Sequence, residues 1–562
     1  QPEKECFPPE LRKHQHLSPV RTDSSRATQV FQQPGNRSMT KLKFTGTCFP
    51  GLLALMLAGN FTLEPQSLVA QTLVSPAFET DGKETDGEKT EGKPQQEDTS
   101  GTEIQVTLTP AGAPDPLLRY RLWPAPETRR NASVDAIISR AIILTIQASN
   151  SESSNSDAGT TTDRNEIQDW QTMPLAQLPI AKVKKYLSQY GFALNELKRG
   201  ESIMRTDYEL HLQDLTTPEL YGTLLPEMQQ ARQLSRVLAL RARVAAAEHR
   251  WDDMIDDCRL GFRLADITGT RGHFLISRLV GQAIASVMQE VIEDAITQGD
   301  PPNFYWALAS VPAQHIYETQ EAIEFEGSLV SRMIKTVGKL PDAPIGEELA
   351  RSKLRELMES NTALSQTIQP LEAPTTMLLM GTLPIAVAEK SRQLLANTDQ
   401  WKNRTEELSN SECVLRATVL EAQRTRDAWI AWSYLPDYLS EKYSDERDKL
   451  VNFNQDSLPG LAKMILMQIL PAFDSVTVAE LRGIQKHNLL QTLEALRMHA
   501  KLTGELPKAI ENLRPVPALP DPITQKDFAY IRSSPTTATI QRSPTRQGDL
   551  KTKLKITLKG TP

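Results

Sequence analysis

The sequence is poor in the residues that build metal sites and disulfide frameworks. It has 562 residues and only four cysteines, at Cys6, Cys48, Cys258 and Cys413. No two of them have the short spacing of a metal-ligand pair, and their wide separation is unlike the dense pattern of a disulfide scaffold. We therefore expect no metal site and a fold that does not depend on disulfide bonds.

An excess of charge of one sign is also lacking. The formal net charge is -7, from 63 basic and 70 acidic side chains distributed along the chain. Proteins that bind nucleic acid or anionic membrane surfaces usually carry a concentrated basic patch. The charge balance therefore predicts no nucleic-acid partner, and no pattern in the sequence indicates an oligomeric state.

The motifs of common catalytic and cofactor sites are absent as well. The chain contains no His-Glu-x-x-His, no Gly-x-Ser-x-Gly, no phosphate-binding loop and no dinucleotide fingerprint. Six of its histidines are scattered, at His211, His249, His273, His315, His487 and His499. We expect these to lie at the surface or to form local hydrogen bonds. The sequence thus predicts no catalytic residues and no cofactor.

No run near the first methionine is long enough to span a membrane, which takes about 20 apolar residues. Met39 is followed by Lys41 and Lys43 and then by an apolar run at residues 49–58. A basic start before about ten apolar residues is typical of a secretory signal peptide. The alternative is that Met39 is internal and the run is a short buried segment.

Small residues suited to signal cleavage follow this run at Ala70 and Ala77. We therefore expect a signal peptide at residues 39–77, an exported mature chain and no transmembrane helix in it. Residues 1–38 show no periodicity, and we interpret them as an upstream extension that is not native.

Composition divides the rest of the chain. Residues 79–101 are dense in Asp, Glu, Lys and Gly with almost no apolar side chains, and such a segment cannot bury enough surface to offset its ordering entropy. The expected organisation is a disordered acidic linker at 78–110, a helical body at 111–474, a long helix with a small β cap at 475–545, and a C-terminal strand or tail at 546–562.

The helical body is organised around residues 227–308. Apolar residues recur there at three- and four-residue steps, with aspartates between them: Trp251, Met254, Ile255, Cys258, Phe262 and Ala265. This is the apolar stripe of an amphipathic helix. The preceding helix carries an apolar face and arginines opposite it. A tight turn between the two favours an antiparallel hairpin.

Further helices are expected at 132–147, 178–187, 208–215, 272–297, 319–337, 347–368, 377–396, 406–434, 461–470 and 476–502. Alternating strands are expected near 105–109, 528–532, 537–541 and 554–558. The fold class is therefore mainly α, an irregular helical bundle or short helical-hairpin array with a small C-terminal β element. Prolines after residue 502 forbid helix, so we expect residues 505–545 to fold back onto the last helix as a cap.

Several stretches resemble known families. The small–large pattern of residues 232–265 is similar to one tetratricopeptide-type hairpin, although no second copy follows at the repeat's spacing. Residues 120–124, 236–265, 281–285, 302–308 and 494–530 together resemble an uncharacterised family of exported helical proteins from planctomycete bacteria. That resemblance implies export and a helical body. It gives no indication of an activity. The tail also resembles the C-terminal part of pseudopilins.

The aromatic residues are the best candidates for binding. Tyr305, Trp306, Trp429 and Trp432 could form a ligand platform, because aromatic faces stack on sugars or on prolines of peptides. The three-residue spacing of Trp429 and Trp432 is equally typical of a core stripe, and aromatics dominate core energetics.

Two functions remain open. The first is a non-enzymatic interaction or structural protein of the cell envelope, with a protein or an envelope polymer as partner. The second is an envelope-polymer hydrolase whose site is assembled from distant residues. Converging carboxylates or a Ser/His pair in a pocket would favour the hydrolase.

The signal peptide generates a first prediction. Export should be accompanied by cleavage after Ala70 or Ala77, which N-terminal sequencing of the protein recovered outside the cytoplasm would detect. A mature chain that still began at Met39 or earlier would contradict it.

Overall fold

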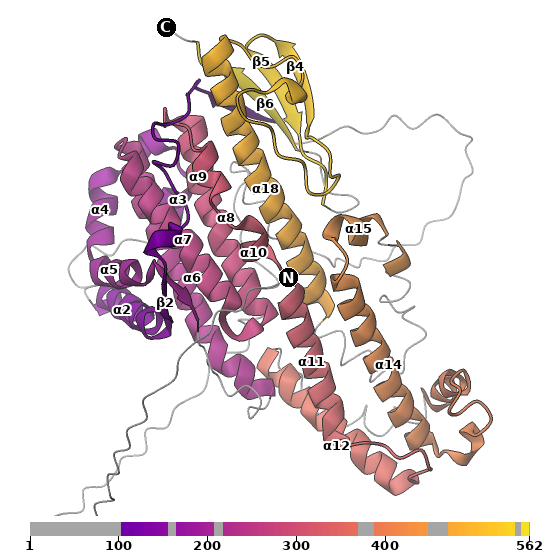
Figure 1. Ribbon diagram of the computed structural model, residues 1–562. Coiled ribbons are helices and arrows are strands. Elements are labelled where there is room, and N and C mark those ends of the chain that lie inside the picture. The colour runs from indigo at the N-terminus through magenta and orange to yellow at the C-terminus, as the bar shows by residue number, and fades with distance from the viewer. Residues whose placement is uncertain are drawn as a thin grey trace, which may run out of the picture. The chain divides into compact units, whose positions relative to one another are not determined.

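The computed structural model describes residues 103–154, 164–206, 217–368, 387–443, 445–447, 470–545 and 552–560. Within these ranges the protein is mainly α-helical with a small sheet, as the sequence predicts (Figure 1). The expected signal peptide, the helix at 208–215, the helix at 461–470 except its last residue, and the first part of the helix at 377–396 lie outside the described residues.

Three helices form the centre: α6 (Thr217–Ala247), α7 (Trp251–Thr270) and α8 (Leu275–Gln298) (Figure 1). The most extensive helix packing is between α7 and α8. Glycine explains it: a Cβ on Gly281 would lie 2.6 Å from the Ala265 carbonyl oxygen, and one on Gly261 would overlap Met288. The two backbones therefore approach more closely than they could if either glycine were replaced by a residue with a Cβ atom.

The stripe expected on α7 is present, with differences at two positions. Met254, Ile255, Cys258, Phe262 and Ala265 are all buried. Trp251 is only half-buried at the turn, where its ring lies 5.5 Å from that of His249. Asp257, which the sequence pattern places on the solvent side, is also buried, because its carboxylate accepts hydrogen bonds from Arg241 of α6. The hairpin is thus closed by an ion pair as well as by apolar packing.

Helix α8 is, in the described part of the chain, the one helix long and apolar enough to cross a membrane by length and composition. Most of that stretch is buried in the protein. It also carries polar side chains that serve its neighbours: Gln282 donates to the Tyr317 carbonyl at 2.7 Å and Gln289 to the Gly483 carbonyl at 3.1 Å. These are the features of a core helix.

A smaller group of helices covers α6 on the N-terminal side. It comprises α2 (Asp135–Ser154), α3 (Arg164–Thr172), α4 (Ile180–Ser188) and α5 (Gly191–Gly200), of which α2, α3 and α4 contact α6. The first residues of the helix expected at 132–147 belong instead to β2 (Arg130–Ser133), which pairs in parallel with β3 (Ile203–Arg205). A serine–aspartate contact then starts α2, since the Ser133 hydroxyl donates to the Asp135 carboxylate at 2.6 Å.

The other side of the protein contains α11 (Gln320–Thr336), α12 (Glu347–Ile368), α14 (Asn410–Ser433) and α15 (Asp437–Lys442). α12 has the bounds that its periodicity predicts. α14 begins four residues later than expected because Ser409 caps it, accepting a hydrogen bond from the Glu412 amide. A short helical segment at Thr405–Glu407 precedes that cap.

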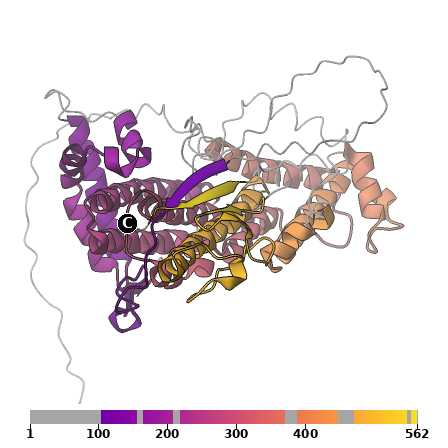
Figure 2. The same ribbon diagram turned by 90° about the horizontal axis from the view of Figure 1, so that it is seen from above.

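The sheet joins both ends of the described chain. Its strand order is β1-β6-β5-β4, formed by β1 (Glu103–Leu108), β4 (Ala529–Ser534), β5 (Thr537–Gln541) and β6 (Lys553–Leu558). β6 lies inside the sheet, antiparallel to β5 and parallel to β1 (Figure 2). The linker expected at 78–110 therefore overlaps an ordered strand at its end. The strand expected at 554–558, in the C-terminal strand or tail at 546–562, is present as β6 and lies inside the sheet.

The cap expected on the last helix is confirmed. Asn488 of α18 (Leu470–Thr503) donates to the Pro520 carbonyl at 2.8 Å, and the Leu519 amide donates to the Thr492 hydroxyl at 3.2 Å. On the inner side of β4, Phe528 is buried and the Tyr530 hydroxyl donates to the Pro507 carbonyl at 2.9 Å. The proline-rich segment thus satisfies its backbone groups against α18 and the sheet.

A buried ion pair on α18 fixes the remaining connections. Arg497 and Glu494 are both fully buried, with nitrogen–oxygen distances of 2.8 and 2.9 Å. The Arg497 guanidinium also donates to the Thr109 carbonyl at 2.8 Å and to the Pro301 carbonyl at 2.6 Å. One side chain thereby joins the segment after β1, the loop after α8 and α18 itself.

This pair generates a stability prediction. Arg497→Met leaves the Glu494 carboxylate buried without its counter-ion, so the free energy of unfolding should fall by about 3–5 kcal/mol in urea titrations. The matched control is Arg351→Met, which removes an exposed i,i+4 partner of Glu347 and should cost less than about 1 kcal/mol. The double variant Glu494→Met/Arg497→Met should recover part of the loss, and equal losses for Arg497→Met and the control would refute the prediction.

Candidate functional site

The four candidate aromatics occupy two separate places. Tyr305 and Trp306 belong to α9 (Tyr305–Ala309), with ring centroids 5.2 Å apart. Tyr305 is buried and its hydroxyl donates to the Pro517 carbonyl at 3.1 Å. This tyrosine therefore holds the proline-rich segment of the cap. Trp306 is half-buried against the main core.

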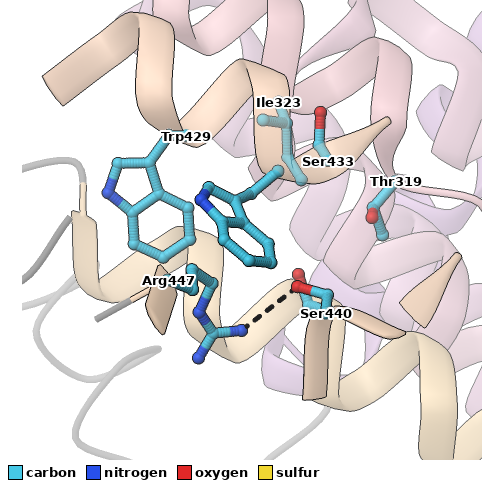
Figure 3. Close-up of a pocket in the computed structure, with 8 residues that line it drawn as sticks. Thr319, Ile323, Trp429, Ser433, Ser440 and Arg447 are labelled. Atoms are coloured by element: carbon cyan, nitrogen blue, oxygen red, sulfur yellow. Dashed lines mark hydrogen bonds between the residues drawn. The ribbon is translucent and has the colours of Figure 1, made fainter. Parts of the chain in front are cut away.

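Trp429 and Trp432 lie at the end of α14 and line a pocket (Figure 3). The open space between its walls is about 350 Å³, mouth included. Trp429 is 7% exposed, whereas Trp432 is half-buried. The lining residues are Thr319, Ile323, Trp429, Trp432, Ser433, Ser440, Arg447 and Thr477. The pocket is thus built at the junction of α11, α14, α15 and α18.

Arg447 brings a positive charge to one wall of this pocket. Its guanidinium carbon lies 6.0 Å from the Trp429 ring centroid, within the range of a cation–π contact, and its Nη1 donates to the Ser440 hydroxyl at 3.5 Å (Figure 3). Tyr434, at the end of α14, and Tyr443, just after α15, are 57% and 45% exposed.

The pocket's chemistry is that of binding. It offers indole faces, serine and threonine hydroxyls and a guanidinium, and no carboxylate, histidine or cysteine is among its lining residues. The Thr319 hydroxyl already donates to Glu480 at 2.6 Å. A serine nucleophile needs an adjacent base, and neither Ser433 nor Ser440 faces one among these residues.

A histidine–carboxylate contact occurs elsewhere. His315 of α10 (Ala313–Tyr317) lies with its Nε2 3.0 Å from the Asp266 carboxylate, which raises the pKa of His315. Asp266 is also bound by the buried Arg263. In the described ranges no serine, threonine or cysteine side chain hydrogen-bonds to His315. The contact therefore resembles a structural ion pair more than a catalytic one.

Some polar side chains that the sequence pattern places at the surface are buried in the structure. His487 is 4% exposed, and burial lowers its pKa to about 4, against an opposing hydrogen bond to the Leu308 backbone. Of the two alternatives expected for the histidines, His487 therefore has a hydrogen bond and not a surface position. In the acidic run of α7, Asp252 and Asp253 are exposed while burial raises the pKa of Asp257 to about 6.

The described residues contain no group of three or more His, Cys, Asp or Glu side chains that could hold a metal ion. Cys258 and Cys413 are free and buried in different clusters of the core. Burial raises the pKa of both thiols, so neither is an activated nucleophile.

Two of the pocket's residues are evident in the sequence and the others are not. Trp429 and Trp432 stand out as aromatics. Thr319, Ser440 and Arg447 come from three other segments, and no local pattern marks them. Comparisons of the chain with protein-family models, with curated proteins and with solved structures found no match.

The buried histidine generates a pH prediction. His487 is neutral in the folded protein down to about pH 4, whereas an unfolded histidine takes up a proton near pH 6.5. The unfolded state therefore binds more protons between these values, and stability should fall as the pH drops from 6.5 to 4, by at most about 3 kcal/mol.

The variant His487→Gln should lose less stability than wild type as the pH falls from 6.5 to 4. Urea unfolding curves recorded from pH 4 to 8 would measure this. His315→Gln is the control of opposite sign, because the raised pKa of His315 contributes stability below pH 6.5 that is lost as the pH rises through its folded value. Parallel pH curves for wild type and His487→Gln would contradict the assignment.

Proposed function

We propose that the protein is an exported, non-enzymatic interaction protein of the cell envelope that holds an envelope polymer in the pocket at Trp429 and Trp432. Export rests on the basic start at Met39, the apolar run after it and the small-residue sites. The tetratricopeptide-like pattern of the central hairpin favours an interaction role. The resemblance to exported planctomycete proteins supports the same setting.

The observation that carries the proposal is the composition of the pocket wall. A sugar ring has an apolar face and a rim of hydroxyls, and the pocket sets indole faces beside Ser433, Ser440 and Thr477. Trp432 is only half-buried, so its ring keeps surface that a ligand can cover. The absence of an acid or base from these lining residues favours binding over hydrolysis.

The pocket suits contact with part of a long ligand rather than enclosure of a whole one. Its open space of about 350 Å³ includes solvent at the mouth, so the enclosed part is much smaller than a typical small-molecule site. A polymer could therefore lie across the pocket with the face of one unit against the Trp432 ring.

A co-sedimentation assay with purified insoluble peptidoglycan tests the proposal. Trp432→Ala should weaken binding at least tenfold, about 1.4 kcal/mol, since aromatic side chains in pockets carry most of such binding energy. Trp306→Ala is the matched control, because it removes a half-buried tryptophan from another element and should leave binding unchanged.

The outcomes separate the alternatives. No binding by wild type, or equal loss in both tryptophan variants, would overturn the assignment of the pocket. Release of soluble fragments from the polymer during the incubation would favour the hydrolase.

A further inference from the structure

Helix α6 carries a polar stripe. Its residues are about 200 positions before the tryptophans of the aromatic pocket in the sequence. Gln229, Arg232, Gln233 and Arg236 follow one another at spacings of three, one and three residues, and all four are half-buried. Residues three and four apart lie on one side of a helix, so the two guanidinium groups are neighbours. The stripe is a cationic, amide-rich surface beside the buried apolar side of the helix.

The two arginines differ from the other arginines of the same helix. Arg241 is paired with the Asp257 carboxylate, and Arg243 is paired with Asp294 and also donates to the Met173 carbonyl. The guanidinium groups of Arg232 and Arg236 form no hydrogen bond or ion pair with any residue that the structure describes. Among the described residues, two of the four arginines on α6 therefore lack the carboxylate partner that the other two have.

This arrangement costs free energy in the empty protein. Burial lowers the pKa of both arginines, and for Arg232 the neighbouring charge of Arg236 lowers the pKa further. Desolvating a cation without a partner is unfavourable, and so are like charges at i and i+4. An anion between the two guanidinium groups would remove both costs at once.

The surroundings supply a fixed wall for such a ligand. Gln233 points its amide at two phenol oxygens, 3.3 Å from Tyr186 and 3.4 Å from Tyr190. The Tyr186 ring packs in turn on Trp170, with centroids 5.9 Å apart. The side of α6 next to the arginines is therefore rigid and aromatic, which favours a defined position for the guanidinium groups.

We propose that Arg232 and Arg236 form a binding site for an oxyanion, the carboxylate or phosphate group of a ligand. Arginine suits this role because its planar fork matches both groups and keeps its charge at every physiological pH. The site is independent of the aromatic pocket. The anion comes either from a separate ligand or from the chain's own acidic segment at residues 79–101.

The test uses the full chain and inorganic phosphate, with sodium acetate in a second series and sodium chloride at matched ionic strength as reference. Phosphate should raise the melting temperature of wild type in a saturable way, and calorimetry should give a dissociation constant. Arg232→Gln/Arg236→Gln should weaken that binding at least tenfold. Arg355→Gln removes an exposed arginine of α12 and should bind as wild type does.

The melting temperatures of wild type and the double variant without added phosphate or acetate show whether the two arginines form a binding site or stabilise the fold. In chloride, the melting temperature of the double variant should equal or exceed that of wild type. The variant loses two neighbouring positive charges that lack a counter-ion. A lower melting temperature there, no saturable response in wild type, or an equal response in the double variant would each overturn the proposal.

A variant lacking residues 79–101 distinguishes the sources of the anion. Tighter phosphate binding in this variant assigns the site to the acidic segment. Unchanged binding assigns it to an external ligand.

Discussion

The structure depends on one buried charge pair. The guanidinium of Arg497 is fully removed from water, so its donors must be met by protein acceptors. Glu494 meets part of this need, and carbonyl groups of Thr109 and Pro301 meet the rest. These carbonyls belong to segments without a regular hydrogen-bond ladder. The pair therefore decides where β1 enters the sheet and where the chain turns after α8.

The two proposed sites share a physical character. In both, a polar or aromatic side chain has a less favourable environment in the ligand-free protein than similar side chains have in the neighbouring core. Trp432 stays half-buried near Trp429, and the Arg232 guanidinium has no carboxylate partner among the described residues, about three turns from a well-paired Arg243. Departures from local consistency are expected where a protein binds something. The pocket offers hydroxyls and ring faces and the α6 stripe offers cations, so they suit different chemical groups.

Local patterns predicted the elements, and long-range contacts decided the rest. α12 and β5 have the bounds expected from periodicity, because side-chain repeats record which face is buried. The burial of Asp257 could not be read from α7 alone, since its partner Arg241 belongs to another helix. The same holds for the pocket, in which Thr319, Ser440 and Arg447 meet the tryptophans only after folding. Sequence reasoning found the aromatic half of that site and could not find the polar half.

The parallel pairing of β1 with β6 has a consequence for the order of events in the cell. A ribosome makes β1 before every helix of the body and β6 after all of them, and domains form as their residues emerge. β1 must wait with an unpaired backbone edge until nearly the whole described chain exists. An exposed edge is a template for pairing with other chains. The edge of β1 that β6 will cover is therefore open to misassembly until the last strand is made, and β1 then remains at the edge of the sheet.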